Sequence, residues 1–258
     1  MGYESPMPVQ EEVIPFLLGD DNDVIALAQT GTGKTAAFGL PILQKIDVTT
    51  YHPQALVLCP TRELCLQIAD DLNDYSKYID NLKVLPVYGG SSIESQIKTL
   101  KRGVHVVVAT PGRLLDLMNR KTVDLSLVKN VIMDEADEML NMGFTDSINA
   151  ILAEVPENRN MLLFSATIPP SIKSTIDALL TDPATVEIAR VGETADTVEE
   201  HLCPVTQGQK AELLRALLDT GGAAGERPER VLVFCRTKQR VDDVSKTLKN
   251  GGVRVDVM

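Results

Sequence analysis

The chain has 258 residues, of which 44% are hydrophobic and 24% charged, values typical of globular proteins. It shows neither a signal-peptide pattern nor an unbroken apolar stretch of about 18 residues, so the composition favours a cytoplasmic protein and excludes membrane spans. The net charge of −11 argues against binding of nucleic acid through a broad basic surface, because phosphates are neutralised by clustered Lys and Arg. The four cysteines lack C-x-x-C spacing, so neither a disulfide framework nor a zinc site is expected.

Short apolar runs rich in β-branched residues alternate with longer helical stretches along most of the chain. The predicted strands are Val24–Ala28, Ala55–Cys59, Val84–Tyr88, His105–Ala109, Val131–Met133 and Met161–Phe164. The predicted helices include Leu64–Tyr75, Ser92–Arg102, Pro111–Met118 and Phe144–Leu152. This alternation predicts an α/β fold with a mostly parallel sheet flanked by helices, and ligands at the carboxyl ends of its strands.

The segment 28–35 lies between a predicted strand and a predicted helix, which is the setting of a phosphate-binding loop. Glycines at two positions allow a tight turn in which backbone N–H groups point at phosphate oxygens, and the next helix adds its positive amino end. Lys34 is expected to reach the β- and γ-phosphates, and the Thr35 hydroxyl to ligate Mg²⁺. Ala28 replaces the first glycine of the strict pattern, so the match is to its relaxed form. The candidate nucleotide-binding residues here are Thr30, Gly31, Thr32, Gly33, Lys34 and Thr35.

Two acids follow the predicted strand Val131–Met133. We expect Asp134 to hold Mg²⁺ through water and Glu135 to orient or deprotonate the attacking water. Crowded carboxylates repel one another, which favours a cation among them. The candidate catalytic residues are therefore Glu135, Lys34 and Asp134, the candidate metal ligands Thr35 and Asp134, and the expected ligands a nucleotide and Mg²⁺.

Residues 134–137 read Asp-Glu-Ala-Asp, the signature of DEAD-box helicases, which the chain resembles along its whole length. The segment Gly2–Gln10 resembles the Q motif of this family, in which the glutamine, here Gln10, recognises the edge of adenine. Residues 165–167 resemble the element that couples hydrolysis to strand separation; the resemblance implies that the hydroxyls of Ser165 and Thr167 hydrogen-bond to Asp137.

Three further segments, residues 60–64, 89–90 and 110–113, resemble the family elements that contact single-stranded RNA along its backbone. Thr61 and Thr110 are also well placed to cap helices and so present N–H groups to phosphates. Contact with the backbone alone implies little sequence preference. The implied RNA-contacting residues are Thr61, Arg62, Gly90, Thr110 and Arg113.

The resemblance implies a RecA-like nucleotide-binding domain over residues 1–194, and a linker with the truncated beginning of a second RecA-like domain over residues 195–258. The second part is predicted to contain the helices Gln209–Leu218 and Lys238–Lys249, the strands Val231–Cys235 and Val253–Val257, and a polar loop, Asp219–Glu229. The parent protein is then expected to be a monomeric ATP-dependent RNA helicase. The arginines that reach the γ-phosphate would lie beyond Met258, so weak nucleotide binding and negligible RNA-stimulated ATP hydrolysis are expected of these residues alone.

Two other readings compete with this one. A nucleotide kinase or a GTPase would share the phosphate loop and the acidic strand end, although the Asn-Lys-x-Asp stretch of GTPases is absent from the sequence. A non-catalytic interaction module could retain the fold, but the presence of Lys34, Thr35, Asp134 and Glu135 argues against it.

Overall fold

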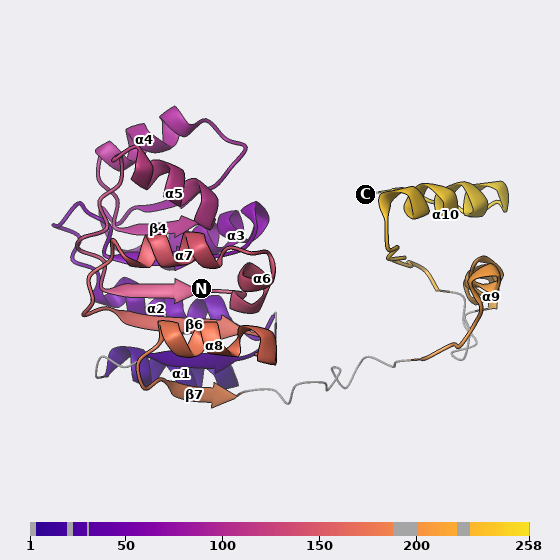
Figure 1. Ribbon diagram of the computed structural model, residues 1–258, viewed down its shortest axis with the longest axis horizontal. Coiled ribbons are helices and arrows are strands. Elements are labelled where there is room, and N and C mark those ends of the chain that lie inside the picture. Colours follow the sequence, from indigo (N-terminus) through magenta and orange to yellow (C-terminus); the bar gives the residue numbers. More distant parts are fainter. Residues whose placement is uncertain (1–3, 20–22, 30, 188–200, 221–227, 258) are drawn as a thin grey trace. The chain divides into compact units, whose positions relative to one another are not determined.

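The computed structural model describes residues 4–19, 23–29, 31–187, 201–220 and 228–257 (Figure 1). The chain divides into two compact units, Met1–Glu193 and Thr194–Met258. The domain boundary predicted after residue 194 falls among residues 188–200, outside the described ranges, and stays a prediction.

A seven-stranded parallel sheet forms the centre of the first unit, with the order β3-β4-β2-β5-β6-β1-β7. The strands are β1 (Val24–Leu27), β2 (Ala55–Leu58), β3 (Val84–Val87), β4 (Val106–Ala109), β5 (Asn130–Met133), β6 (Asn160–Ser165) and β7 (Ala184–Glu187). The parallel sheet is confirmed, and the ends of the six predicted strands are correct to within one residue. Apolar runs this continuous indicate strands buried on both faces, as crossover helices require.

Helices cover both faces of the sheet (Figure 1). The helices α1 (Pro8–Leu18), α2 (Lys34–Lys45) and α3 (Arg62–Tyr75) pack on one face, and α4 (Ile93–Lys101), α5 (Pro111–Asn119), α6 (Ala136–Asn141), α7 (Thr145–Leu152) and α8 (Pro170–Leu179) on the other. Alternate strand residues enter the two cores: Leu56 and Leu58 face the second group of helices, and Ala55 and Val57 the first. All strands point the same way, so the segments that follow them meet at one edge of the sheet.

The second unit contains a 3₁₀ turn, η1 (Gln207–Gln209), and two helices, α9 (Lys210–Thr220) and α10 (Lys238–Asn250). The two helices predicted here are confirmed, whereas the predicted strands 231–235 and 253–257 are wrong: both segments are irregular. A strand is defined by its hydrogen-bonded neighbours, and neither segment pairs with another among the described residues; Leu232 and Phe234 are 61% and 88% exposed. The predicted loop 219–229 lies mostly outside the described residues.

Candidate active site

The loop between β1 and α2 has the backbone of a phosphate-binding turn. Gly31 and Gly33 have φ values of +83° and +86°, which residues with a side chain rarely adopt. Gly33 is the N-cap of α2, so the free N–H groups of the first helical turn point toward the space that this loop surrounds. The Thr32 hydroxyl donates to the Gln29 carbonyl at 2.8 Å and closes the turn. Thr30, a predicted nucleotide contact, lies outside the described residues.

Lys34 and Asp134 form a buried ion pair at the centre of this edge. Lys34 Nζ lies 3.5 Å from Asp134 Oδ1, and the side chains are 7% and 5% exposed. The sheet order explains the meeting, because β1 and β5 are the two neighbours of β6 and their carboxyl ends flank it. Burial raises the pKa of Asp134 above its ordinary value, although the Lys34 ammonium pulls the pKa down. The single Lys34 charge therefore does not offset the cost of burying this carboxylate.

Glu135 has an unusual backbone conformation. Its φ of +52° and ψ of +50° are left-handed, which is uncommon for a residue other than glycine and is concentrated at functional sites. Its N–H donates to Asp134 Oδ1 at 3.0 Å. Burial, followed by the neighbouring Asp134 charge, raises the pKa of the Glu135 carboxyl. A carboxylate with a raised pKa is a better proton acceptor, as activation of water requires.

Thr35 has a partner that the sequence analysis missed. A hydrogen bond between the Thr35 and Asp71 side chains counteracts the rise that burial causes in the pKa of Asp71. Asp71 lies on α3 between the buried residues Ile68 and Leu72, and an acid beside the apolar face of an amphipathic helix is the sequence signal for such a contact. Binding of Mg²⁺ by Thr35 would have to compete with this bond.

Gln10 is buried against the phosphate loop. Its Nε2 donates to the Gly33 carbonyl at 3.2 Å, and its Oε1 accepts from Met7 N at 2.9 Å. A primary amide has two donor hydrogens and two acceptor lone pairs, so one of each remains for a ligand. Gln10 thus links α1 to the loop, and its contact with adenine stays a prediction.

The predicted RNA-contacting residues follow β2, β3 and β4, which form one half of the sheet. Thr61 caps α3, with its hydroxyl accepting from Leu64 N at 3.2 Å. The Arg62 guanidinium lies 5.0 Å from the centre of the Tyr88 ring. Gly90 has a φ of +85°.

Two of the predictions about hydroxyl groups need correction. Thr110 is the N-cap of α5, but its side chain makes no capping bond; Pro111, which has no N–H and fits the first helical position, begins the helix instead. The Thr167 hydroxyl donates to Asp137 Oδ2 at 2.8 Å, as expected, whereas that of Ser165 donates to the Thr167 carbonyl at 2.6 Å. The Ser165 hydroxyl is thus used within its own turn, and only that of Thr167 hydrogen-bonds to the acid.

Within the described ranges, no three His, Cys, Asp or Glu side chains converge as they would around a metal held by protein alone. No helix in the same part of the chain has the length and apolar character to cross a membrane.

The comparisons with known proteins agree with this geometry. Residues 7–175 match the DEAD/DEAH box helicase family. The chain is 48% identical over 255 residues to the DEAD-box ATP-dependent RNA helicase CshA of Streptococcus pneumoniae strain TIGR4, covering 99% of this chain and 47% of that protein. It is 46% identical over 252 residues to the ATP-dependent RNA helicase CshA of Listeria monocytogenes, covering 98% and 47%. The chain thus spans about half the length of these relatives.

Solved structures show the same fold. The crystal structure of a DEAD box protein from the hyperthermophile Methanococcus jannaschii superposes with a TM-score of 0.69 at 37% identity, covering 100% of this chain and 67% of that one. A hypothetical ATP-dependent RNA helicase from Sulfolobus tokodaii gives a TM-score of 0.65 at 43% identity, covering 73% and 54%. On the family match, the identities and the shared sheet, the chain belongs to the DEAD/DEAH box helicase family.

Proposed function

We propose that the chain binds ATP with Mg²⁺ at the ends of β1 and β5 and contacts single-stranded RNA at the ends of β2, β3 and β4, as part of an ATP-dependent RNA helicase. The observation that carries the proposal is the 3.5 Å contact between Lys34 Nζ and Asp134 Oδ1. A loop lysine and a carboxylate on a nearby strand end are the two charges between which phosphate-loop enzymes hold a magnesium triphosphate.

The residues at this edge fit that ligand. Lys34 and the N–H groups of the loop would bind the phosphates, and Thr35 and Asp134 would hold the metal. Bound Mg²⁺ would supply positive charge that neutralises the phosphates and lowers the barrier to attack by water. The raised pKa values of Asp134 and Glu135 support this assignment, because burial among like charges is what a cation would relieve. Glu135 would orient the attacking water and accept its proton.

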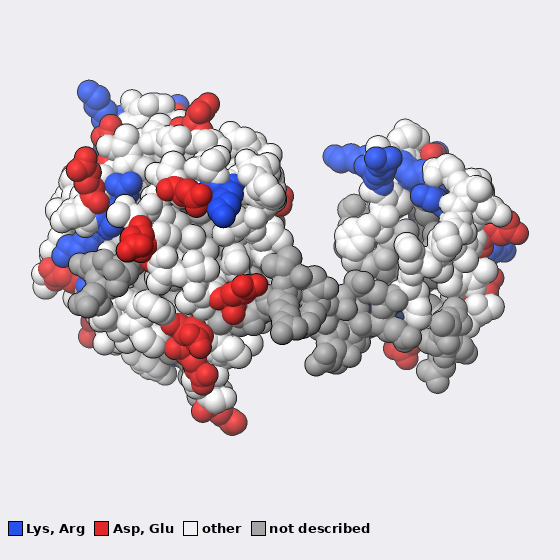
Figure 2. All heavy atoms as spheres, turned by 60° about the horizontal axis from the view of Figure 1, so that its bottom comes forward, with Lys and Arg blue, Asp and Glu red and all other residues white. Residues whose placement is uncertain are grey.

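RNA binding is proposed to depend on local contacts. Thr61 at the start of α3 and Gly112 in the first turn of α5 lie at helix amino ends, which attract phosphates, and Arg62 adds a charge. Acidic side chains predominate on the side of the first unit that carries α1 and β7, which is turned forward in the lower half of Figure 2. A repulsive surface elsewhere on the unit would confine RNA to the strand-end edge.

Coupling of ATP hydrolysis to separation of RNA strands is proposed to act through the Thr167–Asp137 hydrogen bond. A bond of about 1 kcal/mol can rearrange readily when the nucleotide changes. Strand separation is proposed for the protein as a whole, and this chain spans about half the length of its relatives. Weak nucleotide binding and negligible RNA-stimulated hydrolysis by these 258 residues stay predictions.

Calorimetric titration tests the nucleotide site. ATP with Mg²⁺ and ADP with Mg²⁺ should bind, and GTP with Mg²⁺ should bind at least tenfold more weakly, about 1.4 kcal/mol. Lys34→Gln should abolish ATP binding, whereas Lys45→Gln, at the exposed end of the same helix, should leave it unchanged. Equal binding of GTP would favour another class of phosphate-loop enzyme, and no binding of any nucleotide would favour a non-catalytic module.

Salt-dependent binding tests the RNA site. Fluorescence anisotropy with a labelled single-stranded RNA should give similar Kd values for different base sequences. Arg62→Gln should weaken binding and reduce the slope of log Kd against log salt by about 0.7, the value for one phosphate contact on a single strand. Strong dependence on base sequence would contradict recognition through the backbone.

A further inference from the structure

Gln96 is a buried polar side chain outside every predicted site. It lies on α4 and is 6% exposed, although the exposed residues on either side of it, Ser95 and Lys98, show that this helix borders solvent. A buried amide is tolerated only where its donors and acceptor are satisfied. What it binds therefore indicates why it is there.

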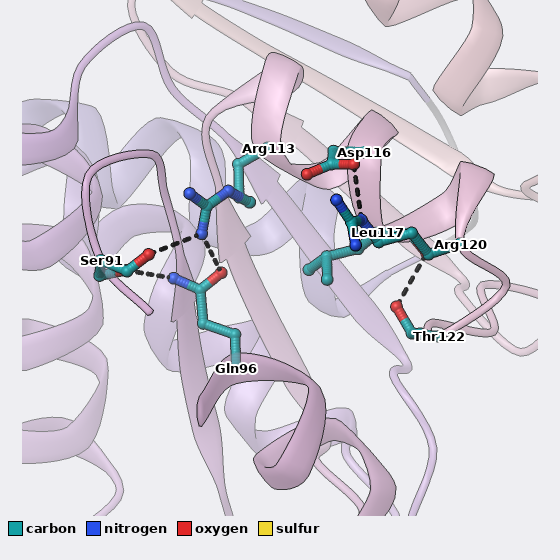
Figure 3. A network of polar contacts seen from close by, with 7 residues as sticks. All are labelled: Ser91, Gln96, Arg113, Asp116, Leu117, Arg120 and Thr122. Atoms are coloured by element: carbon teal, nitrogen blue, oxygen red, sulfur yellow. Dashed lines mark hydrogen bonds and ion pairs between the residues drawn. The ribbon is translucent and has the colours of Figure 1, made fainter. Parts of the chain in front are cut away.

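The Gln96 amide connects three segments (Figure 3). Its Nε2 donates to the Tyr88 carbonyl at 3.1 Å and to Ser91 Oγ at 2.6 Å, which flank Gly89 and Gly90. Its Oε1 accepts from Arg113 Nη1 on α5 at 3.2 Å. The loop after β3 and the helix after β4 are thus joined through one side chain.

Arg113 completes the network from the other side. Its Nη1 also donates to the Ser91 carbonyl, at 3.2 Å, so both hydrogens of this nitrogen are used within the protein. The loop between Tyr88 and Ser91 is held at both ends, although the two glycines at its centre would otherwise have more conformational freedom than any other residues. The sequence analysis assigned Arg113 to RNA contact alone, whereas the structure shows that it also hydrogen-bonds to Ser91 and Gln96.

We infer that Gln96 is a positioning residue for RNA binding: it fixes the Gly89–Gly90 loop relative to the amino end of α5, so that two separate backbone-contacting elements present one rigid surface. The inference rests on the proposed RNA function of this edge. Gln96 is uncharged and buried, so it contributes to RNA affinity through the loop and Arg113 alone. Preorganising a surface raises affinity because less freedom is lost on binding.

The side-chain chemistry explains why glutamine is needed. Two donors must face the loop while an acceptor faces the guanidinium, and an amide alone among neutral side chains of this length supplies both. Gln96→Glu keeps the acceptor and loses both donors, whereas Gln96→Leu loses all three contacts. The matched control is Arg120→Gln, which removes a guanidinium from the exposed 2.8 Å pair with Asp116 on α5; both residues of this pair are also drawn in Figure 3.

The experiment measures RNA affinity and loop mobility on the same proteins. With a fluorescein-labelled single-stranded oligouridylate, Gln96→Leu and Gln96→Glu should each raise Kd about tenfold. This is the effect expected when one or two hydrogen bonds that order the loop are lost. The salt slope of Gln96→Leu should stay that of the wild type, since this variant changes no charge. The Kd for ATP with Mg²⁺ should not change, and hydrogen exchange at residues 88–91 should accelerate. Arg120→Gln should match the wild type in every measurement.

A double variant separates positioning from general damage. The double variant Gln96→Leu, Arg113→Gln should raise Kd by less than the product of the two single-variant increases, because both residues act on one loop. Wild-type RNA affinity and wild-type exchange in Gln96→Leu would overturn the inference. If the wild type itself binds no RNA, the proposed RNA function fails, and unchanged exchange at 88–91 would separately refute the role of Gln96 in holding the loop.

Discussion

Replacing Lys34 by methionine should destabilise the first unit in a way that depends on pH. The substitution keeps an unbranched side chain, shorter by one atom, and removes the positive charge that lies 3.5 Å from Asp134 Oδ1. Asp134 would then be a buried carboxylate beside Glu135, with its pKa raised further above the ordinary value of 3.8. An acid with a raised pKa binds more protons in the folded state than in the unfolded state, so stability is lost as the pH rises above that value.

Protonation of Asp134 limits how much stability Lys34→Met can lose. Asp134 can avoid an unpaired charge by folding as the neutral acid, which from a pKa of 3.8 costs about 4 kcal/mol near pH 7 and about 2 kcal/mol near pH 5.5. We therefore expect Lys34→Met to lower the free energy of unfolding by about 3 kcal/mol near pH 7, within the range for breaking a buried pair. The loss should shrink by about half near pH 5.5.

Urea unfolding followed by circular dichroism at the two pH values measures this loss. Lys45→Met, at the exposed carboxyl end of the same helix, is the matched control and should change stability by less than about 0.5 kcal/mol. A loss for Lys34→Met that is equal at both pH values would refute the reasoning, because it would assign the cost to packing rather than to the carboxylate. Wild-type stability of Lys34→Met at both pH values would show that the ion pair makes no net contribution to stability.

Three further predictions concern single contacts. Gly33→Ala should cost about 1–2 kcal/mol in urea unfolding and weaken ATP binding in calorimetry, since φ is +86° and the new Cβ would lie 2.5 Å from Gln10 Nε2. Unchanged stability and unchanged ATP affinity would contradict the backbone conformation described for this turn. Thr167→Val should cost about 1 kcal/mol in urea unfolding, because Asp137 Oδ2 loses its donor at 2.8 Å; an unchanged free energy of unfolding would show that this bond does not contribute to stability. Burial lowers the pKa of His105 from 6.5, so unfolding free energy should fall as the pH drops below that value; a His105→Gln protein should lack this part of the pH dependence.

The sequence predicted strands and loop residues well because both depend on local pattern. Continuous apolar, β-branched runs marked β1 to β6, and the glycines of the phosphate loop have the positive φ that their positions required. The distance between Lys34 and Asp134 depends on strand order, which no local pattern encodes. The motifs implied that the two residues meet, and the position of β6 between their strands shows how.

The failures came from interactions whose partners are distant in sequence or compete locally. The segments 231–235 and 253–257 have the composition of strands, but pairing decides whether a strand forms. Gln96 was overlooked because one glutamine on a helix gives no signal until Tyr88, Ser91 and Arg113 are seen around it. Asp71 was overlooked although its place beside the apolar face of α3 gave a signal.

The parallel ladder also determines where this molecule can bend. A strand cannot slide by one residue without turning its side chains to the wrong core, and β2 and β5 stay joined up to the bond from Asp134 N to the Leu58 carbonyl, at 2.9 Å. Any rearrangement on ligand binding must therefore be absorbed beyond the strand ends, by rotation about a few backbone torsions. Gly31 and Glu135, with their positive φ angles, lie just beyond the ends of β1 and β5, where such rotation would have to occur.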